Sequence, residues 1–166
     1  MEANKKFVVD SGSARGSNIT IEEVQQALRD IDNWLRSTIP SYSPPPPLPS
    51  PPNDLPAFLR ACLSQSNGGI QLHETFKTLS IEQIQQALSQ NSSSPSYPAS
   101  SIPFSSNADG DFLLTLSSGE VVQWNSEGIV ETLSNNLGLF LESLRNKMLT
   151  RKFQYLGEEC GLIEGV

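Results

Sequence analysis

The sequence predicts an α+β domain in which about four amphipathic helices pack against a mostly antiparallel sheet. Residues 110–128 alternate strand-forming apolar side chains on both sides of Ser118-Gly119, a pattern that predicts a β-hairpin. Four other segments repeat apolar residues at intervals of three and four, as helices with one buried face do. Both faces of the hairpin carry apolar side chains, so we expect a larger sheet covered by helices. A chain of 166 residues is about one domain.

Capping boxes predict where the first and third helices begin. Thr20 with Glu23, and Ser80 with Gln83, have the spacing at which two side chains satisfy exposed backbone N–H groups at a helix start. Pro40 is expected to end the first helix, because proline interrupts helical hydrogen bonding. The expected buried stripes are Ile21, Val24, Leu28, Ile31 and Leu35 in the first helix, and Ile81, Ile84 and Leu88 in the third.

Two further helices are predicted from apolar spacing. The second runs from Asp54 to about Ser66, with Asp54 as its N-cap and Pro56 in its first turn, and glycines in residues 67–69 end it. The last runs from about residue 134 to residue 150. The expected apolar faces are Leu55, Phe58, Leu59, Cys62 and Leu63 in the second helix, and Leu133, Leu137, Phe140, Leu141, Leu144 and Met148 in the last.

Strands are predicted with specific pairing only in the hairpin. A two-residue loop at Ser118-Gly119 sets Leu116 opposite Val121 and Leu113 opposite Trp124, and we expect Trp124 to be a core residue. Elsewhere, residues 70–79 predict one or two short strands, and residues 102–104 predict a short edge segment that touches the core. Residues 152–166 fit either a strand or a packed tail.

The predicted domain organisation is a flexible tail over residues 1–17 and one domain over residues 18–166. Two segments interrupt that domain: a proline-rich insert at residues 43–53 and a serine-rich loop at residues 89–107. The insert is expected to be an extended polyproline II helix, since its prolines fit neither an α-helix nor a central strand. Residues 44–52 contain three P-x-x-P spacings, so they are either a ligand for an SH3 or WW domain or a semi-rigid spacer.

The net charge and the hydropathy of the sequence limit the classes of partner and the cellular compartment that we expect. A net charge of -7 disfavours nucleic acid and anionic membranes, which need a basic surface. Four basic residues lie close together near the end of the last predicted helix: Arg145, Lys147, Arg151 and Lys152. They are either a surface patch that binds an acidic partner or cations that stabilise the C-terminal end of the helix. No apolar run is long enough to span a membrane and no secretory signal is recognisable, so the expected compartment is the cytosol, or alternatively the nucleus.

The residue types needed for catalysis are sparse. His73 is the only histidine, and no partner for a nucleophile can be named from the sequence. Asp109-Gly110-Asp111 lacks the rest of a calcium loop, and residues 67–69 lack the lysine and the glycine spacing of a phosphate site. Cys62 is expected to be a core residue, and Cys160 lies far from it in sequence. We therefore assign no catalytic, cofactor-binding or metal-binding residue and do not expect an enzyme.

Three segments together resemble the SUKH superfamily. The segment LPAFLRACLSQSNGGIQL is similar to its LP…FL…NGG signature, IPFSSNADGDFLLTLSSGEVVQWNSEG to its hydrophobic core strands, and LGLFLESL to its closing helix. The resemblance covers about residues 20–149. The matching positions are Leu55, Pro56, Phe58, Leu59, Asn67, Gly68 and Gly69 in the first segment, and Ile102, Pro103, Phe104, Gly110, Asp111, Gly119, Val121 and Trp124 in the second.

The resemblance implies a function as well as a fold. It implies an α+β fold and a non-enzymatic role in protein–protein binding, in signalling or cell-wall control for fungal members and in toxin neutralisation for bacterial ones. The two inserts depart from the family pattern and favour a regulatory module over an immunity protein, which stays the alternative, followed by an enzyme with an unrecognised site. We expect a monomer with a protein partner, whose identity and binding face the sequence leaves open.

Overall fold

The computed structural model describes residues 18–165, so the tail predicted at residues 1–17 lies outside the described part. Four helices and seven strands follow one another along this part of the chain. The helices are α1 (Ile21–Thr38), α2 (Ala57–Gln65), α3 (Ile81–Asn91) and α4 (Leu137–Leu149). The strands are β1 (Lys77–Thr78), β2 (Ile102–Ser106), β3 (Phe112–Thr115), β4 (Val121–Asn125), β5 (Gly128–Ser134), β6 (Phe153–Tyr155) and β7 (Leu162–Glu164).

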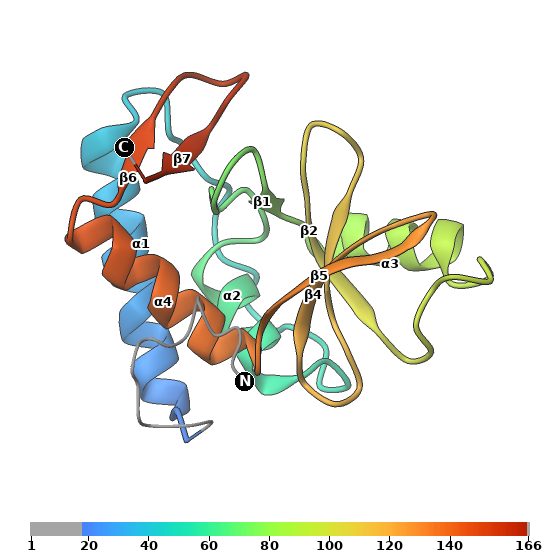
Figure 1. The fold of residues 1–166 in the computed structure, drawn as a ribbon. Coiled ribbons are helices and arrows are strands. Elements are labelled where there is room, and N and C mark those ends of the chain that lie inside the picture. The colour runs from blue at the N-terminus through green and yellow to red at the C-terminus, as the bar shows by residue number, and fades with distance from the viewer. Residues whose placement is uncertain (1–17, 166) are drawn as a thin grey trace.

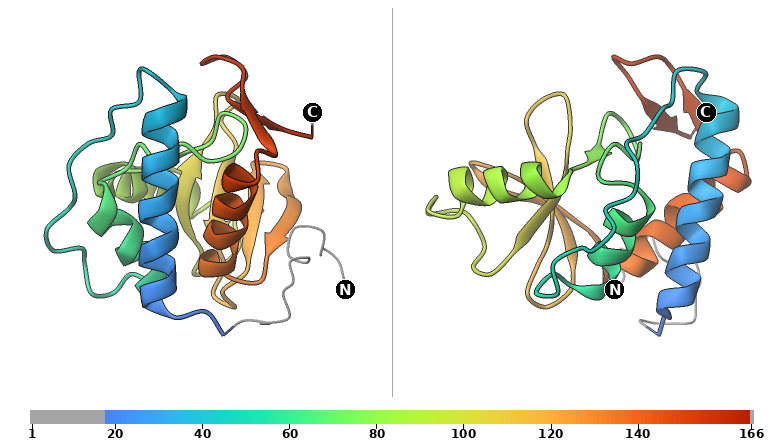
Figure 2. Two further views of the ribbon diagram at one scale, coloured as in Figure 1. Left: turned by 90° about the vertical axis from the view of Figure 1, so that its left-hand side faces the viewer. Right: turned by 180° about the vertical axis from the view of Figure 1, so that it is seen from behind.

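The architecture is an α+β fold, as predicted. Strands β1 to β5 form one antiparallel sheet in sequence order, and β6 and β7 form a separate antiparallel pair. Helices α1, α2 and α4 lie on one side of the large sheet and α3 lies on the other, which Figure 1 shows with the sheet seen edge-on. In Figure 2, α1 and α4 stand in front of the sheet, with β6 and β7 beyond one end of α4.

Helix α1 forms as its sequence predicts. The Thr20 side chain accepts a hydrogen bond from the Glu23 N–H, and the Glu23 carboxylate accepts one from the Thr20 N–H. Its apolar stripe packs on α4 at Gly138, where a Cβ would lie only 2.8 Å from Ile19 Cγ2 and 2.9 Å from Val24 Cγ2. The missing side chain at Gly138 therefore lets the start of α4 approach α1 closely.

The hairpin of β3 and β4 is present, but its predicted register is wrong by one residue. Phe112, not Leu113, lies opposite Trp124, and Leu113 lies opposite Gln123. The reason is the loop: the Gly119 N–H donates to the Leu116 carbonyl, and Gly119 has a φ of +100°. The connection is thus a three-residue turn closed by a left-handed glycine, and its extra residue shifts every pair.

Two predicted helix boundaries are also wrong. Helix α2 begins after Pro56 rather than with Asp54 as its cap, because Leu55 precedes a proline and is pushed away from helical geometry. Helix α4 begins at Leu137, capped by the Asn136 side chain, which accepts a hydrogen bond from the Leu139 N–H. The segment before it, including Leu133, forms the unpredicted strand β5 at the edge of the sheet.

The predicted edge segment at residues 102–104 is instead part of an internal strand. Strand β2 pairs with β1 on one side and β3 on the other, and Phe104 packs edge-on against Phe140 of α4. Pro103 cannot donate to a neighbouring strand, and the register shifts between Pro103 and Ser105. A bulge at this position accommodates a proline inside a sheet.

Trp124 belongs to a second, smaller core on the face of the sheet opposite Leu113. Its side chain is 1% exposed and packs with Leu114 and Val122. The serine-rich segment covers this core: Tyr97 meets the Trp124 ring edge-on at 5.2 Å, and the Ser96 carbonyl accepts the indole N–H at 3.0 Å. The segment after α3 is therefore a structural cover for the sheet.

We expect Trp124→Ala to lower the free energy of unfolding by about 3–5 kcal/mol, because it empties this small core and leaves the Ser96 carbonyl without its donor. Urea denaturation measures the loss. Trp34→Ala is the matched control, since Trp34 on α1 is only half-buried and should cost less. An equal or smaller loss for Trp124→Ala would contradict the packing described.

Candidate functional site

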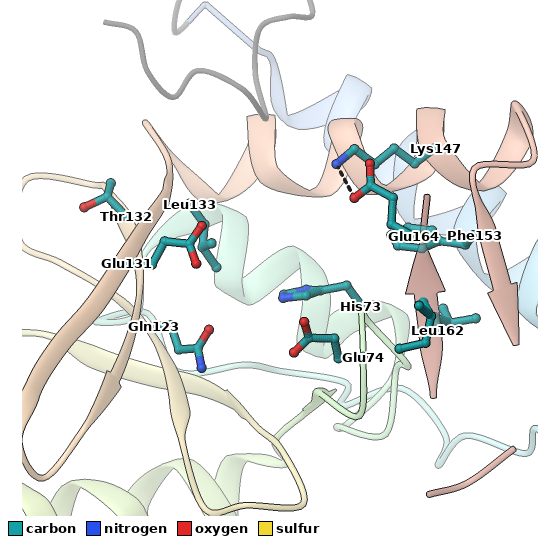
Figure 3. Close-up of a pocket in the computed structure, with 11 residues that line it drawn as sticks. His73, Glu74, Gln123, Glu131, Thr132, Leu133, Lys147, Phe153, Leu162 and Glu164 are labelled. Carbon is teal, nitrogen blue, oxygen red and sulfur yellow. Dashed lines mark hydrogen bonds and ion pairs between the residues drawn. The ribbon is translucent and has the colours of Figure 1, made fainter. Parts of the chain in front are cut away.

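A cavity of about 460 Å³ lies on the α4 side of the sheet, where β4 and β5 extend past the helix. We call it the β5 cleft. One wall is the outer part of β4 and β5, and the facing wall is the loop before β1 together with β7 (Figure 3). Its lining residues are His73, Glu74, Gln123, Glu131, Thr132, Leu133, Lys147, Phe153, Leu162, Ile163 and Glu164. This size suits a side chain or a short peptide segment.

The loop at residues 72–76 is shaped by one buried amide. The Gln71 side chain is 5% exposed, and its Nε2 donates to the carbonyls of Leu72 at 2.9 Å, Glu74 at 2.8 Å and Phe76 at 3.2 Å. A primary amide has two N–H groups, so they are shared among the three carbonyls that face it. The loop backbone is held from the inside, and His73 and Glu74 project into the cleft from it.

Backbone hydrogen bonds fasten this loop to β7. The Glu74 N–H donates to the Leu162 carbonyl at 2.7 Å, and the Leu162 N–H donates back to the Glu74 carbonyl at 3.0 Å. Glu74 has a φ of +52°, which is uncommon for a residue with a side chain. Gly161 has a φ of +71°, and a Cβ there would overlap the Glu74 carbonyl oxygen. The close approach of the two segments therefore requires glycine at position 161.

His73 is a neutral, half-buried base at the back of the cleft. Its ring packs against Phe76 at 5.1 Å and Phe140 at 6.0 Å, and burial, with a smaller contribution from Lys147, lowers its pKa to about 4. Its Nδ1 is buried, and no described residue donates to it or accepts from it. This packing supports a structural role for His73, and a pKa so far below neutrality suits general acid–base catalysis poorly.

Acidic side chains dominate the polar lining. Lys147 on α4 pairs with Glu164 on β7 at 3.0 Å, which ties the helix to the facing wall. Glu74 and Glu131 are exposed, and no basic side chain among residues 18–165 forms an ion pair with either. With His73 neutral, the cleft keeps an excess of negative charge.

Strand β5 forms the rim of the cleft and the edge of the large sheet. Its exposed apolar side chains, Ile129 and Val130, are 50% and 53% accessible. The pairing with β4 shifts twice, so that Val130 and Leu133 have no direct partner and form bulges. Glu131 lies opposite Gln123 and lines the cleft, whereas Ile129 lies opposite Trp124 and so belongs to the other face of the sheet. The edge strand thus carries exposed apolar side chains beside a carboxylate that faces the cleft.

The basic residues predicted as a possible patch do not act together. Arg145 binds Asp30 of α1 at 2.7 Å, and Lys147 binds Glu164, so these two hold α4 to its neighbours. Arg151 and Lys152 are exposed beyond the end of the helix. Only Lys147 of the four lies in the cleft.

The Asp-Gly-Asp and Asn-Gly-Gly motifs noted in the sequence form a turn and a connection between helices. Asn107 accepts hydrogen bonds from the N–H groups of Asp109 and Asp111, so the Asp-Gly-Asp segment is the turn between β2 and β3. The Asn67 side chain accepts a hydrogen bond from the Ile81 N–H at 2.9 Å, and a Cβ on Gly68 would lie 2.5 Å from the Ser80 nitrogen. The Asn-Gly-Gly segment therefore joins the end of α2 to the start of α3.

Cysteine and metal chemistry are equally limited in the described residues. Cys62 is buried in the main core, where burial raises its pKa to about 12, and Cys160 is exposed, and both are free thiols. No group of three or more potential metal ligands comes together within residues 18–165. In the same range, no helix is both long enough and apolar enough to cross a bilayer.

A family sequence profile decides the relationship that the motifs suggested. The profile of the SMI1 / KNR4 family (SUKH-1) matches residues 52–143, more than half of the chain. The chain belongs to this family. The match spans α2 to the first half of α4 and includes the whole large sheet, so the resemblance to SUKH proteins is confirmed. No curated protein matches the chain.

The SUKH-1 match covers one wall of the cleft and only part of the facing wall. The loop carrying Glu74 and the rim carrying Glu131 fall inside residues 52–143, whereas Lys147 and the β6–β7 pair follow it. Patterns in the sequence drew attention to His73 and Lys147 but not to Glu74, Glu131 or Glu164. A signal for Glu131 was present, because GIVETLS has strand-forming residues directly before a helix cap.

We expect Gln71→Leu to lower the free energy of unfolding by about 1–3 kcal/mol, because loop carbonyls lose their buried donor. Hydrogen exchange at the Glu74 amide should also accelerate more than exchange in α1. Gln85→Leu, at an exposed position on α3, is the control and should change neither measurement. Unchanged exchange at Glu74 in the Gln71 variant would show that the amide does not hold the loop.

We expect His73 to make the protein less stable as the pH falls from 6.5 to 4. Its pKa is about 4 in the folded protein and 6.5 for an unperturbed histidine, so the unfolded chain binds more protons in this window, and stability is full only above it. The size is about 2–3 kcal/mol. Unfolding free energies of the wild type and His73→Phe, compared at pH 7 and pH 4, isolate this effect because the carboxylates are common to both. Parallel pH dependences would contradict the assignment.

Proposed function

We propose that this SUKH-1 chain is a non-enzymatic regulatory module that binds a protein partner through the β5 cleft. The observation that supports the proposal is the composition of β5: Glu131, which forms no ion pair with any residue in 18–165, lines the cleft, and the exposed Ile129 and Val130 precede it on the same edge strand. Exposed apolar side chains beside polar groups are typical of protein-binding surfaces. The free thiols of Cys62 and Cys160 favour a reducing compartment, the cytosol or the nucleus.

The chemistry of the cleft specifies the partner segment. Glu74 and Glu131 approach from opposite walls, so a cationic side chain placed between them would satisfy both. Leu133 and Leu162 line the same space and favour the aliphatic stem of a lysine or arginine. Val130, exposed directly beside Glu131 on β5, is available to contact an aliphatic neighbour of that cation. We therefore expect a segment with one basic residue flanked by aliphatic ones.

The groups in the cleft support binding more than turnover. The pKa of His73 is lowered to about 4, so the imidazole is neutral at neutral pH, and its buried Nδ1 has little access to a substrate. Lys147 is held by Glu164. A binding module needs only the fixed charges and the apolar rim, which the structure supplies.

A displayed library of random 12-residue peptides, selected on the wild-type chain, tests this proposal. We expect the selected peptides to contain a lysine or arginine beside aliphatic residues, and to lose about tenfold or more in affinity for Glu74→Lys/Glu131→Lys. Glu22→Lys/Glu82→Lys is the matched control, because these exposed carboxylates lie on α1 and α3, away from the cleft lining. Its binding should equal that of the wild type.

Two outcomes would overturn the proposal. Selected peptides that bind the cleft variant as well as the wild type would place the binding surface elsewhere. Selected peptides could instead contain no basic residue and still fail to bind the cleft variant. That result would keep the cleft as the binding site but would reject a cationic ligand. Thermal unfolding of both variants shows that neither result comes from loss of the fold.

A further inference from the structure

The proline-rich segment is packed on the domain along part of its surface, with Pro44, Leu48 and Pro51 half-buried. A polyproline II helix has three residues per turn, so residues three apart share a ridge. Pro45, Leu48 and Pro51 form one such ridge. Leu48 and Pro51 are half-buried. Pro45 is exposed over much of its surface, but one side of its ring lies over Gly69, where a Cβ would come within 2.7 Å of the Pro45 Cδ. This ridge faces the domain.

Backbone hydrogen bonds fix the segment in place. The Leu48 N–H donates to the Leu63 carbonyl of α2 at 2.9 Å, and the Asn67 N–H donates to the Pro46 carbonyl at 3.0 Å. The Ser66 hydroxyl donates to the Pro45 carbonyl at 3.0 Å. The segment is therefore attached to α2 and to the Asn-Gly-Gly connection, and it is more than a loose spacer.

The other two ridges face outward. Ser43, Pro46 and Pro49 share one of them, and all three are exposed. On the adjacent ridge, Pro47 and Ser50 are exposed and Pro44 is half-buried. Protein domains that recognise polyproline II take the prolines of such ridges into grooves lined by aromatic side chains. The domain thus covers one ridge of the helix and leaves available the surface that these grooves use.

We propose that the outward ridges of residues 43–50 are the docking surface for a proline-reading domain of the WW type. Residues 43–52 contain no ionisable side chain, so recognition must come from apolar contact with aromatic rings. The nearest preceding cation, Arg36, is paired with Asp32 at 2.8 Å and lies over the Tyr42 ring. An SH3 groove that needs a flanking cation fits this surface less well.

Attachment to α2 adds a thermodynamic consequence. The segment is already ordered by its hydrogen bonds to Leu63, Ser66 and Asn67 before a partner arrives. Binding then loses less chain entropy than binding of a free peptide does. The full chain should consequently bind a WW domain more tightly than a peptide of residues 41–54. Because no charge takes part, the affinity should change little with salt.

The test is isothermal titration of the full chain with a panel of purified WW and SH3 domains, at 50 and 500 mM NaCl. We expect at least one WW domain to bind, and Pro46→Ala/Pro49→Ala on the outward ridge to weaken that binding about tenfold or more. The matched control is Pro45→Ala/Pro51→Ala on the inward ridge. It should lower the melting temperature while affecting binding less than the outward pair does.

The results that would overturn the proposal are distinct. Absence of binding by every WW domain at concentrations up to about 1 mM would reject it. An equal loss for the inward and outward pairs, with both variants folded, would reject the assignment of ridges. Binding only to SH3 domains, with an affinity that falls strongly as salt rises, would reject recognition by apolar contact alone. Glu74→Lys/Glu131→Lys should still bind WW domains, which separates this surface from the β5 cleft.

Discussion

The side-chain amide of Gln71 is the contact on which the cleft depends. Three backbone carbonyls of the loop at residues 72–76 converge on it. The Glu74 and Phe76 carbonyls also accept the backbone N–H groups of Leu162 and Leu72, so the amide adds a second donor to each of them and reaches the Leu72 carbonyl from inside the loop. With the amide in place, the loop can turn sharply enough to bring Glu74 against β7. One buried polar side chain thus positions a wall built from two segments that lie almost ninety residues apart.

Helix caps and apolar spacing in the sequence predicted most of the helices. They could not predict strand register, which a single extra residue in a turn changes. Both capping boxes formed, since their partners lie within one turn of each other. The hairpin register depended on whether the turn at Gly119 contains two or three residues, which alternation alone cannot decide. Strand β5 was not predicted because most of it is exposed and two bulges interrupt it. Its apolar residues therefore do not alternate regularly between the two faces of the sheet.

The candidate site was less predictable than the fold, for a physical reason. Its charged groups come from a loop, an edge strand, a helix and a terminal strand, and no short spacing connects them. Glu74 reaches the cleft only because Gly161 has no side chain and tolerates a left-handed backbone. The family relationship fixes the scaffold, whereas the wall formed by β6 and β7 lies beyond the matched residues.

The two bulges of β5 also make this border of the sheet a poor template for a neighbouring molecule. A long, flat border strand offers a continuous row of donors and acceptors, on which a neighbouring molecule can build an intermolecular sheet. Val130 and Leu133 interrupt that row after only a few residues, and Glu127 and Glu131 add like charges beside it. The apolar Ile129 and Val130 are thus exposed on a strand that disfavours fibrous stacking at high concentration.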